Sequence, residues 1–197
     1  MTKSTQYIPR HVTLGEIADL VPGYSEKESG DRGRGPLHIL QARDFDASGA
    51  IRWNQLDRCE AKPGAERARL HPDDVLLMVR AADPRARHVA TVPADVVAGA
   101  TFTILRCRRD TVDARFLTWL LDTEGTRQLL RGELRGSAMP FLGVADLKHF
   151  SIPLPPLQQQ LAIARVHGLR HRMTELSHRL DRAVGQLLES AAGLSAS

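Results

Sequence analysis

The sequence contains few cysteines, few lysines and no long apolar run. Its two cysteines, Cys59 and Cys107, lack CxxC spacing and a cysteine-rich context, so we expect a reduced pair rather than a disulfide. No apolar run approaches the roughly 20 residues that are needed to span a bilayer. The first residues lead into no hydrophobic signal segment. We therefore expect a cytoplasmic protein that contacts no membrane.

Motifs for nucleotide binding and catalysis are also absent from the sequence. There is no G-x-x-x-x-G-K-[ST] motif, which excludes a P-loop ATPase. No glycine-rich dinucleotide or S-adenosylmethionine loop follows a predicted strand, and Leu154-Pro155-Pro156-Leu157 is not the Asp/Asn-Pro-Pro-aromatic motif of amino-methyltransferases. No Ser–His–Asp or Cys–His nucleophile can be argued from the sequence. We expect a chain with no catalysis and no cofactor of its own.

Two possible metal sites find little support. His167 and His171 have the i, i+4 spacing of zinc ligands on a helix, but no third ligand is obvious and both fall on the solvent side of the predicted helix. A nuclease site would combine Pro72-Asp73 with a carboxylate–lysine motif. Glu60-Ala61-Lys62 precedes that pair, and Asp146-Leu147-Lys148 lies far beyond it. A small metal-dependent nuclease is kept as the less favoured alternative.

Arginine accounts for most of the positive charge. The 197 residues carry a net charge of +4, with 23 arginines against 4 lysines. The planar guanidinium suits phosphates and guanine edges, so a polyanionic partner is favoured. A GC-rich genome would produce the same bias toward arginine. The charge alone therefore supports nucleic-acid binding only modestly.

The C-terminal part predicts one long helix. Pro156 suits the first helical position, and no proline interrupts residues 157–197. A helix that reached residue 190 would be roughly 50 Å long. Apolar residues repeat there in steps of three and four, which is a heptad seam: Val166, Leu169, Met173, Leu176, Leu180, Ala183 and Leu187. We predict a helical spacer and dimerisation coiled coil over residues 156–190, with an ordinary core helix as the alternative.

Residues 7–155 predict one mixed α/β domain. Thr13 and Glu16 form a T-x-x-E capping box for a short helix over residues 13–20, after a loose lead-in over residues 1–12. Periodicity and turn residues predict strands at 37–40, 51–53, 75–80, 88–92, 101–106 and 150–154, and helices at 114–122, 124–134 and 144–149.

Several segments resemble the specificity (S) subunit of type I restriction–modification systems. Gly136-Ser137-Ala138-Met139-Pro140-Phe141-Leu142 is similar to the family pattern G-S-x-x-P-x-L. Ile152-Pro153-Leu154-Pro155-Pro156-Leu157, followed by three glutamines, resembles I-P-L-P-P-L-x-E-Q before a long helix, with Gln159 where Glu is common. Leu70–Leu77 is similar to L-x-x-G-D-I-L, with Asp73 where glycine is usual, and Leu14–Asp19 resembles the opening of the family's domain.

The resemblance implies a target recognition domain followed by a helical spacer. Full-length family members carry two such pairs, read the two halves of a bipartite double-stranded DNA site and dock two adenine-N6 methyltransferase subunits, which use S-adenosylmethionine. The whole can recruit an ATP-dependent restriction subunit. This sequence contains one domain and one spacer, so we expect it to pair with a second copy of itself and to read an inverted repeat. A stand-alone DNA-binding regulator is a further alternative.

Candidate DNA-contacting residues come from three regions of the predicted domain. They are a glycine-rich finger over residues 24–36, the hairpin around the Asp83-Pro84 turn, and the segment before Pro140. For any single arginine among them a solvated surface charge is the favoured interpretation, and it is the grouping of Arg80, Arg85 and Arg87 around the turn that supports DNA contact. The candidates are Tyr24, Ser25, Arg32, Arg34, Arg43, Arg80, Arg85, Arg87, Ser137 and Met139. A second arginine cluster, at 106, 108 and 109, is expected to meet phosphates.

Overall fold

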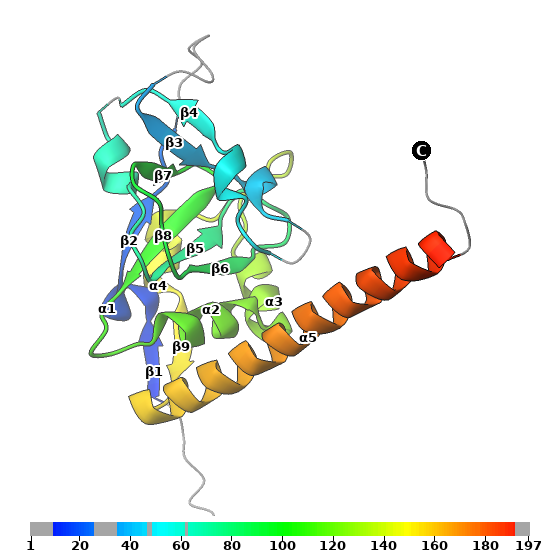
Figure 1. Ribbon diagram of the computed structural model, residues 1–197. Helices are drawn as coiled ribbons and strands as arrows, with labels where there is room; N and C mark the ends of the chain where they lie inside the picture. Colours follow the sequence, from blue (N-terminus) through cyan, green and yellow to red (C-terminus); the bar gives the residue numbers. More distant parts are fainter. Residues whose placement is uncertain (1–9, 26–34, 47–48, 62, 192–197) are drawn as a thin grey trace, which may run out of the picture.

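The protein consists of a globular α/β part and one long helix that extends away from it (Figure 1). The structure is a computed structural model and describes residues 10–25, 35–46, 49–61 and 63–191. The long helix, α5 (Leu157–Ala191), begins directly after the globular part. The predicted fold class, a mixed α/β domain followed by a long C-terminal helix, is confirmed.

A four-stranded antiparallel sheet lies at the centre of the globular part. Its order is β2 (Ala18–Pro22), β8 (Phe102–Cys107), β5 (Asp74–Met78) and β6 (Ala86–Val89). The inner strands β5 and β8 are buried on both faces. Along these strands alternate side chains enter different cores, because successive residues of a strand point to opposite faces. Leu76 belongs to one core, and its neighbour Leu77 belongs to the other.

The core that contains Leu77 is covered by helices. These are the single turn α1 (Leu14–Ile17), α2 (Ala114–Asp122), α3 (Glu124–Gly132) and α4 (Val144–His149). Asp113 caps α2, because its carboxylate accepts hydrogen bonds from the backbone N–H groups of Arg115 and Phe116, both at 3.0 Å. The buried side chains of Phe116, Leu117 and Leu121 then face the sheet.

The core that contains Leu76 is covered by a three-stranded sheet. Its order is β4 (Asp57–Cys59), β3 (Leu37–Leu40) and β7 (Val96–Ala98), with β3 and β7 parallel. Three short 3₁₀ turns accompany this sheet, namely η1 (Ala42–Asp44), η2 (Trp53–Gln55) and η3 (Ala65–Ala68).

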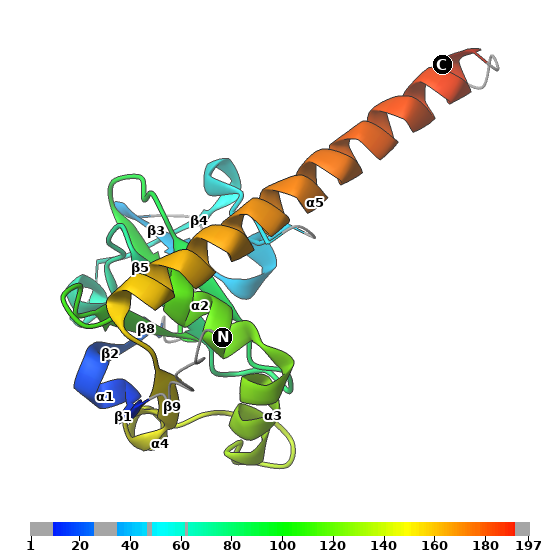
Figure 2. The same cartoon turned by 90° about the horizontal axis from the view of Figure 1, so that it is seen from below.

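A two-stranded sheet joins the two ends of the globular part. Strand β1 (Arg10–Thr13) pairs antiparallel with β9 (Ser151–Leu154), and Arg10 lies opposite Leu154. Strand β9 leads through Pro155 and Pro156 into α5. The beginning of α5 lies against α2, and its distal part extends clear of the domain, as the view from below in Figure 2 also shows.

Several predicted elements are confirmed. The strand at 37–40 and the helices at 114–122 and 144–149 have the predicted bounds. The predicted strand at 88–92 is shifted, because β6 covers Ala86–Val89. Short strands β4 and β7 were not predicted, since three residues carry too little periodicity.

Three predictions at the chain's β-segments and lead-in are wrong. The predicted helix at 13–20 is only one turn long, because the chain becomes extended at Ala18 and pairs there with β8. The predicted capping contact is present, since the Glu16 carboxylate accepts a hydrogen bond from the Thr13 backbone N–H at 2.6 Å. The predicted lead-in contains most of β1. In the predicted strand at 51–53, Ile51 makes only an isolated bridge and Trp53 begins η2.

No disulfide joins Cys59 and Cys107. Burial raises the pKa of the Cys107 thiol to about 12. Among the helices that the structure describes, none is both long enough and apolar enough to cross a membrane.

Candidate nucleic-acid interface

The predicted glycine-rich finger is only partly described by the structure. Arg32 and Arg34 lie outside the described residues. Ser25 is exposed. Tyr24 is 6% exposed, and its hydroxyl donates a hydrogen bond to the backbone oxygen of Glu60 at 3.2 Å. Tyr24 is therefore part of the core in this structure, and DNA contact by Tyr24 stays a prediction that its burial does not favour.

The hairpin candidates Arg85 and Arg87 pair with carboxylates of this chain. The Arg85 Nε atom lies 3.0 Å from Asp83, and an Nη atom of each arginine lies within 4 Å of Asp122, at 3.8 Å for Arg85 and 3.5 Å for Arg87. These ion pairs hold the β5–β6 turn against α2. DNA contact by Arg85 and Arg87 stays a prediction, but the structure already gives both side chains a role within the domain.

Asp83 is the centre of this arginine cluster. Arg127 and Arg131, both from α3, approach its carboxylate to 2.8 Å. Burial alone would raise the pKa of Asp83, but the hydrogen bond from Arg127 and the charge of Arg85 lower the pKa below its ordinary value. Sequence reasoning missed this role, because Asp83 was taken only as a turn residue.

The segment before Pro140 forms a small exposed loop. It is closed by two backbone hydrogen bonds between Arg135 and Phe141, both 2.9 Å, and Gly136 turns the chain with a φ of +84°. Ser137 and Met139 are exposed on this loop.

The loop is fixed to the central sheet. The backbone N–H of Leu142 donates to the oxygen of Val79 at 2.8 Å. This bond brings the chain around the exposed Arg80 next to the segment that carries Ser137 and Met139. The remaining candidate, Arg43, is exposed on η1 and pairs with Asp57, at the other sheet. Arg43 thus belongs to another sheet, but its segment approaches the candidate Arg87 at Gly49.

Two residues of the second arginine cluster, Arg106 and Arg109, line a surface hollow of about 660 Å³ beside the start of α5. The charges of the cluster are largely compensated within the chain. Arg109 lies 3.2 Å from Asp73, Arg106 lies 3.5 Å from the buried Asp74, and Arg108 donates to the backbone oxygen of Glu16 at 3.0 Å. This compensation weakens the expectation that these arginines meet phosphates.

Asp73 has a left-handed backbone conformation in this hollow, with a φ of 70°. Glycine adopts such a conformation without the steric cost that a Cβ atom imposes. The resemblance placed Asp73 where the S-subunit pattern usually has glycine, and the conformation gives the physical reason for that preference. The carboxylate pairs with the His88 Nε2 atom at 3.1 Å.

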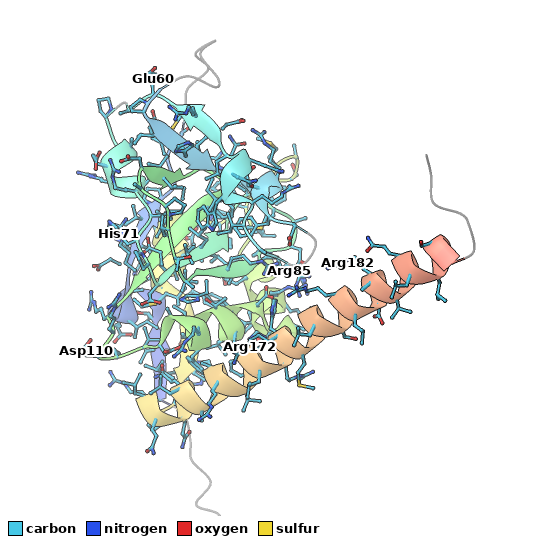
Figure 3. All side chains as sticks on the ribbon, viewed as in Figure 1. Glu60, His71, Arg85, Asp110, Arg172 and Arg182 are labelled. Carbon is cyan, nitrogen blue, oxygen red and sulfur yellow. The ribbon has the colours of Figure 1, made fainter. Side chains whose placement is uncertain are left out.

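The nuclease alternative receives no support from the arrangement of these carboxylates. The described residues contain no group of three or more His, Cys, Asp or Glu side chains that could hold a metal ion. Figure 3 shows Glu60 at the top of the domain, and His71, which lines the hollow beside Asp73, about half-way down. Asp74 accepts a hydrogen bond from the His71 backbone N–H at 2.8 Å and has a structural role.

The heptad seam of α5 is exposed. Only the first turns of the helix are packed on the domain, where Gln160 and Ala164 are buried. Beyond them every seam residue is exposed, Leu176 at 60% and Leu187 at 70%, and so are Val184 and Leu188 beside the seam. An ordinary core helix is therefore excluded for this part of α5. His167 and His171 are also exposed, as expected from their place in the heptad.

Comparisons with known proteins find matches to the fold but not to the sequence. No family model and no curated protein matches the sequence. Among solved structures, the S subunit from M. genitalium matches with a TM-score of 0.61 and 14% identity over 93% of this chain and 45% of that chain. The HsdS subunit from Thermoanaerobacter tengcongensis matches with a TM-score of 0.58 and 24% identity over 92% of this chain and 42% of that chain.

A third match is a chain from a structure that describes complex assembly and conformational transition of the type I restriction–modification system, with a TM-score of 0.65 and 21% identity over 98% of this chain and 47% of that chain. This chain has the S-subunit fold. It spans about half the length of the S-subunit structures that it matches. The resemblance stated from the proline-rich segment is thus confirmed at the level of the fold.

Proposed function

We propose that this chain is the DNA sequence-specificity subunit of a type I-like DNA adenine methyltransferase or restriction–modification complex. The observation that carries the proposal is the S-subunit fold, which extends over more than nine-tenths of the chain and includes α5. In this role the globular domain binds double-stranded DNA. The chain performs no catalysis, and the partner methyltransferase subunit supplies the S-adenosylmethionine chemistry.

We infer that a second copy of the chain covers the exposed seam of α5. A bare apolar stripe of this length favours association. Because the chain spans about half of each S-subunit structure, two copies would supply two recognition domains. An antiparallel pair of α5 helices would place the two domains at opposite ends of the rod. The half-site spacing would then follow from the length of α5.

Charge does not prevent this pairing. Arg165, Arg172 and Arg179 lie at the g positions beside the seam, and Arg170 lies at an e position. Like charges on an exposed helix surface cost a few tenths of a kcal/mol. Burial of one leucine contributes about 1.5–3 kcal/mol. Apolar burial therefore exceeds the repulsion.

The arginine edge is left exposed for a further partner. We propose that it binds an acidic surface of the methyltransferase subunit, and that the assembled complex can recruit an ATP-dependent restriction subunit. Arg165, Arg170, Arg172 and Arg179 are all exposed in the structure.

Co-expression tests the proposal. The tagged chain is expressed beside the DNA adenine methyltransferase subunit of its host, and the purified material is assayed for both proteins and for adenine methylation of duplex DNA. We expect a stable complex that methylates DNA only when both proteins are present. A chain that never retains the methyltransferase would favour the stand-alone regulator. Metal-dependent nicking of plasmid that Asp73→Ala abolishes would favour the nuclease.

A further inference from the structure

Strands β3 and β4 are connected by a long segment over residues 41–56, of which 47 and 48 are not described. Its backbone is fixed by local hydrogen bonds. The Asp44 carboxylate accepts from the Gln41 backbone N–H at 2.7 Å, and the Asp44 backbone oxygen accepts from Arg52 N–H at 2.9 Å. A further backbone bond of 3.0 Å runs from Gln55 to Arg52 and closes the η2 turn.

Apolar side chains anchor this segment to the domain. Phe45, Ile51, Trp53 and Leu56 pack against the core that contains Leu76. The Phe45 ring lies 5.9 Å from the ring of Phe102, which is buried in β8. The η2 turn is therefore a supported platform, and the side chains that it exposes have a defined position.

Asn54 and Gln55 are the exposed residues of η2. Among the described residues, no hydrogen bond or ion pair involves the side-chain amide of Asn54 or of Gln55. The neighbouring arginines are engaged within the chain, since Arg52 donates to the backbone oxygen of Arg43 and Arg43 pairs with Asp57. The amides are the uncommitted polar groups of this turn.

The charges of the segment cancel. Within residues 41–56, Arg43 and Arg52 are matched by Asp44 and Asp46. A segment without net positive charge is poorly suited to bind phosphates of any sequence, because such binding depends on cationic side chains. Uncharged amides are instead the groups that recognise adenine, where the carboxamide oxygen accepts from N6 and the carboxamide nitrogen donates to N7 in the major groove.

We propose that Asn54 and Gln55 read an adenine of the target sequence in the major groove of duplex DNA. The inference rests on the proposed function and deepens it, since it assigns base recognition to a segment outside the candidates drawn from the sequence. Figure 1 shows this segment, coloured light blue to cyan between β4 and β6, on the side of the domain toward which α5 extends.

A selection from randomised duplex DNA tests the inference. The wild-type chain, Asn54→Asp, Gln55→Glu and Gln158→Ala are each carried through the same selection. The first two changes keep the side-chain shape and remove the N–H donor. The third removes an exposed amide at the start of α5, away from η2. Thermal unfolding of each variant verifies that it is folded.

We expect the wild type and Gln158→Ala to enrich one common motif. Asn54→Asp or Gln55→Glu should reduce the preference for A·T at one position of that motif by about 5-fold to 100-fold, in addition to any uniform loss of affinity that the new carboxylate causes. If both amide variants retain the wild-type motif, or lose affinity equally for all sequences, the inference is overturned and the proposed function is not affected. A wild-type chain that enriches no sequence would overturn the proposed function and the inference with it.

Discussion

The side-chain amide of Gln160 accepts a hydrogen bond from the backbone N–H of Asp113 at 3.0 Å, and so fastens α5 to the start of α2. The same amide donates to the backbone oxygens of Thr111 at 3.2 Å and Pro155 at 2.8 Å. Gln160 is 1% exposed. A single buried side chain thus satisfies three backbone groups at the point where the rod leaves the domain.

We expect Gln160→Ala to destabilise the domain by about 1–3 kcal/mol, because it leaves buried backbone groups without partners. The matched control is Gln158→Ala, whose amide is exposed on the same helix turn and should change stability by less than about 0.5 kcal/mol. Urea denaturation of both variants measures the difference. Equal midpoints for the two variants would contradict a fastening role for Gln160.

Asp83→Asn should lower stability in a pH-dependent way. The folded-state pKa of Asp83 is lowered, so its ionised carboxylate contributes stability above the unfolded-state pKa, about 3.9, and this contribution is lost as the pH falls through the folded-state pKa. The difference in thermal unfolding midpoint between wild type and Asp83→Asn should therefore be largest at pH 7 and should disappear at acid pH. Asp181→Asn, at an exposed site on α5, serves as control. A gap of the same size at all pH values would rule out this linkage.

Substitutions at Asp73 separate the cost of its backbone conformation from the value of its ion pairs. Asp73→Gly and Asp73→Ala both remove the pairs with His88 and Arg109, but only alanine keeps a Cβ atom at a φ of 70°. We expect the glycine variant to be more stable than the alanine variant by about 1 kcal/mol. Denaturation of the two variants is the measurement, and an alanine variant that is equally stable would show that the conformation relaxes.

The dimer proposed for α5 depends on its seam. Leu176→Glu should give a monomer at micromolar concentration, because it places a charge within an otherwise apolar interface. Arg182→Glu adds the same carboxylate outside the seam, so this variant should stay dimeric. The double variant Arg172→Glu with Arg179→Glu should also stay dimeric, but we expect it to lose binding of the methyltransferase subunit. Figure 3 shows Arg172 and Arg182 along α5. Sedimentation measures the mass of each variant, and a monomeric wild type would refute the homodimer.

The sequence predicted those parts of the fold that depend on long patterns. The heptad seam and the prolines of residues 153–156 located α5, and the apolar face of residues 114–122 located α2. Short elements were missed or misplaced because pairing across the sheet decides them. Ala18–Leu20 continues an amphipathic helical pattern, yet these residues belong to β2 because they pair with β8.

The candidate site was predicted less well than the fold. A basic side chain in a loop looks the same in the sequence whether it meets DNA or a carboxylate of its own chain, and only the structure shows that Arg85 and Arg87 have partners. Asn54 and Gln55, in contrast, were not candidates in the sequence and became so only through their exposure in the structure. Their exposure depends on how Phe45 and Trp53 anchor a segment that has no periodic pattern.

The central claim is that this chain directs adenine methylation to a specific DNA sequence. A genome-wide map of N6-methylated adenines, in host cells with the gene present and with the gene deleted, tests this claim most directly. The account predicts one methylated sequence with two half-sites in inverted orientation, present in the first map and absent from the second. Identical maps in a host that expresses the methyltransferase subunit would contradict it.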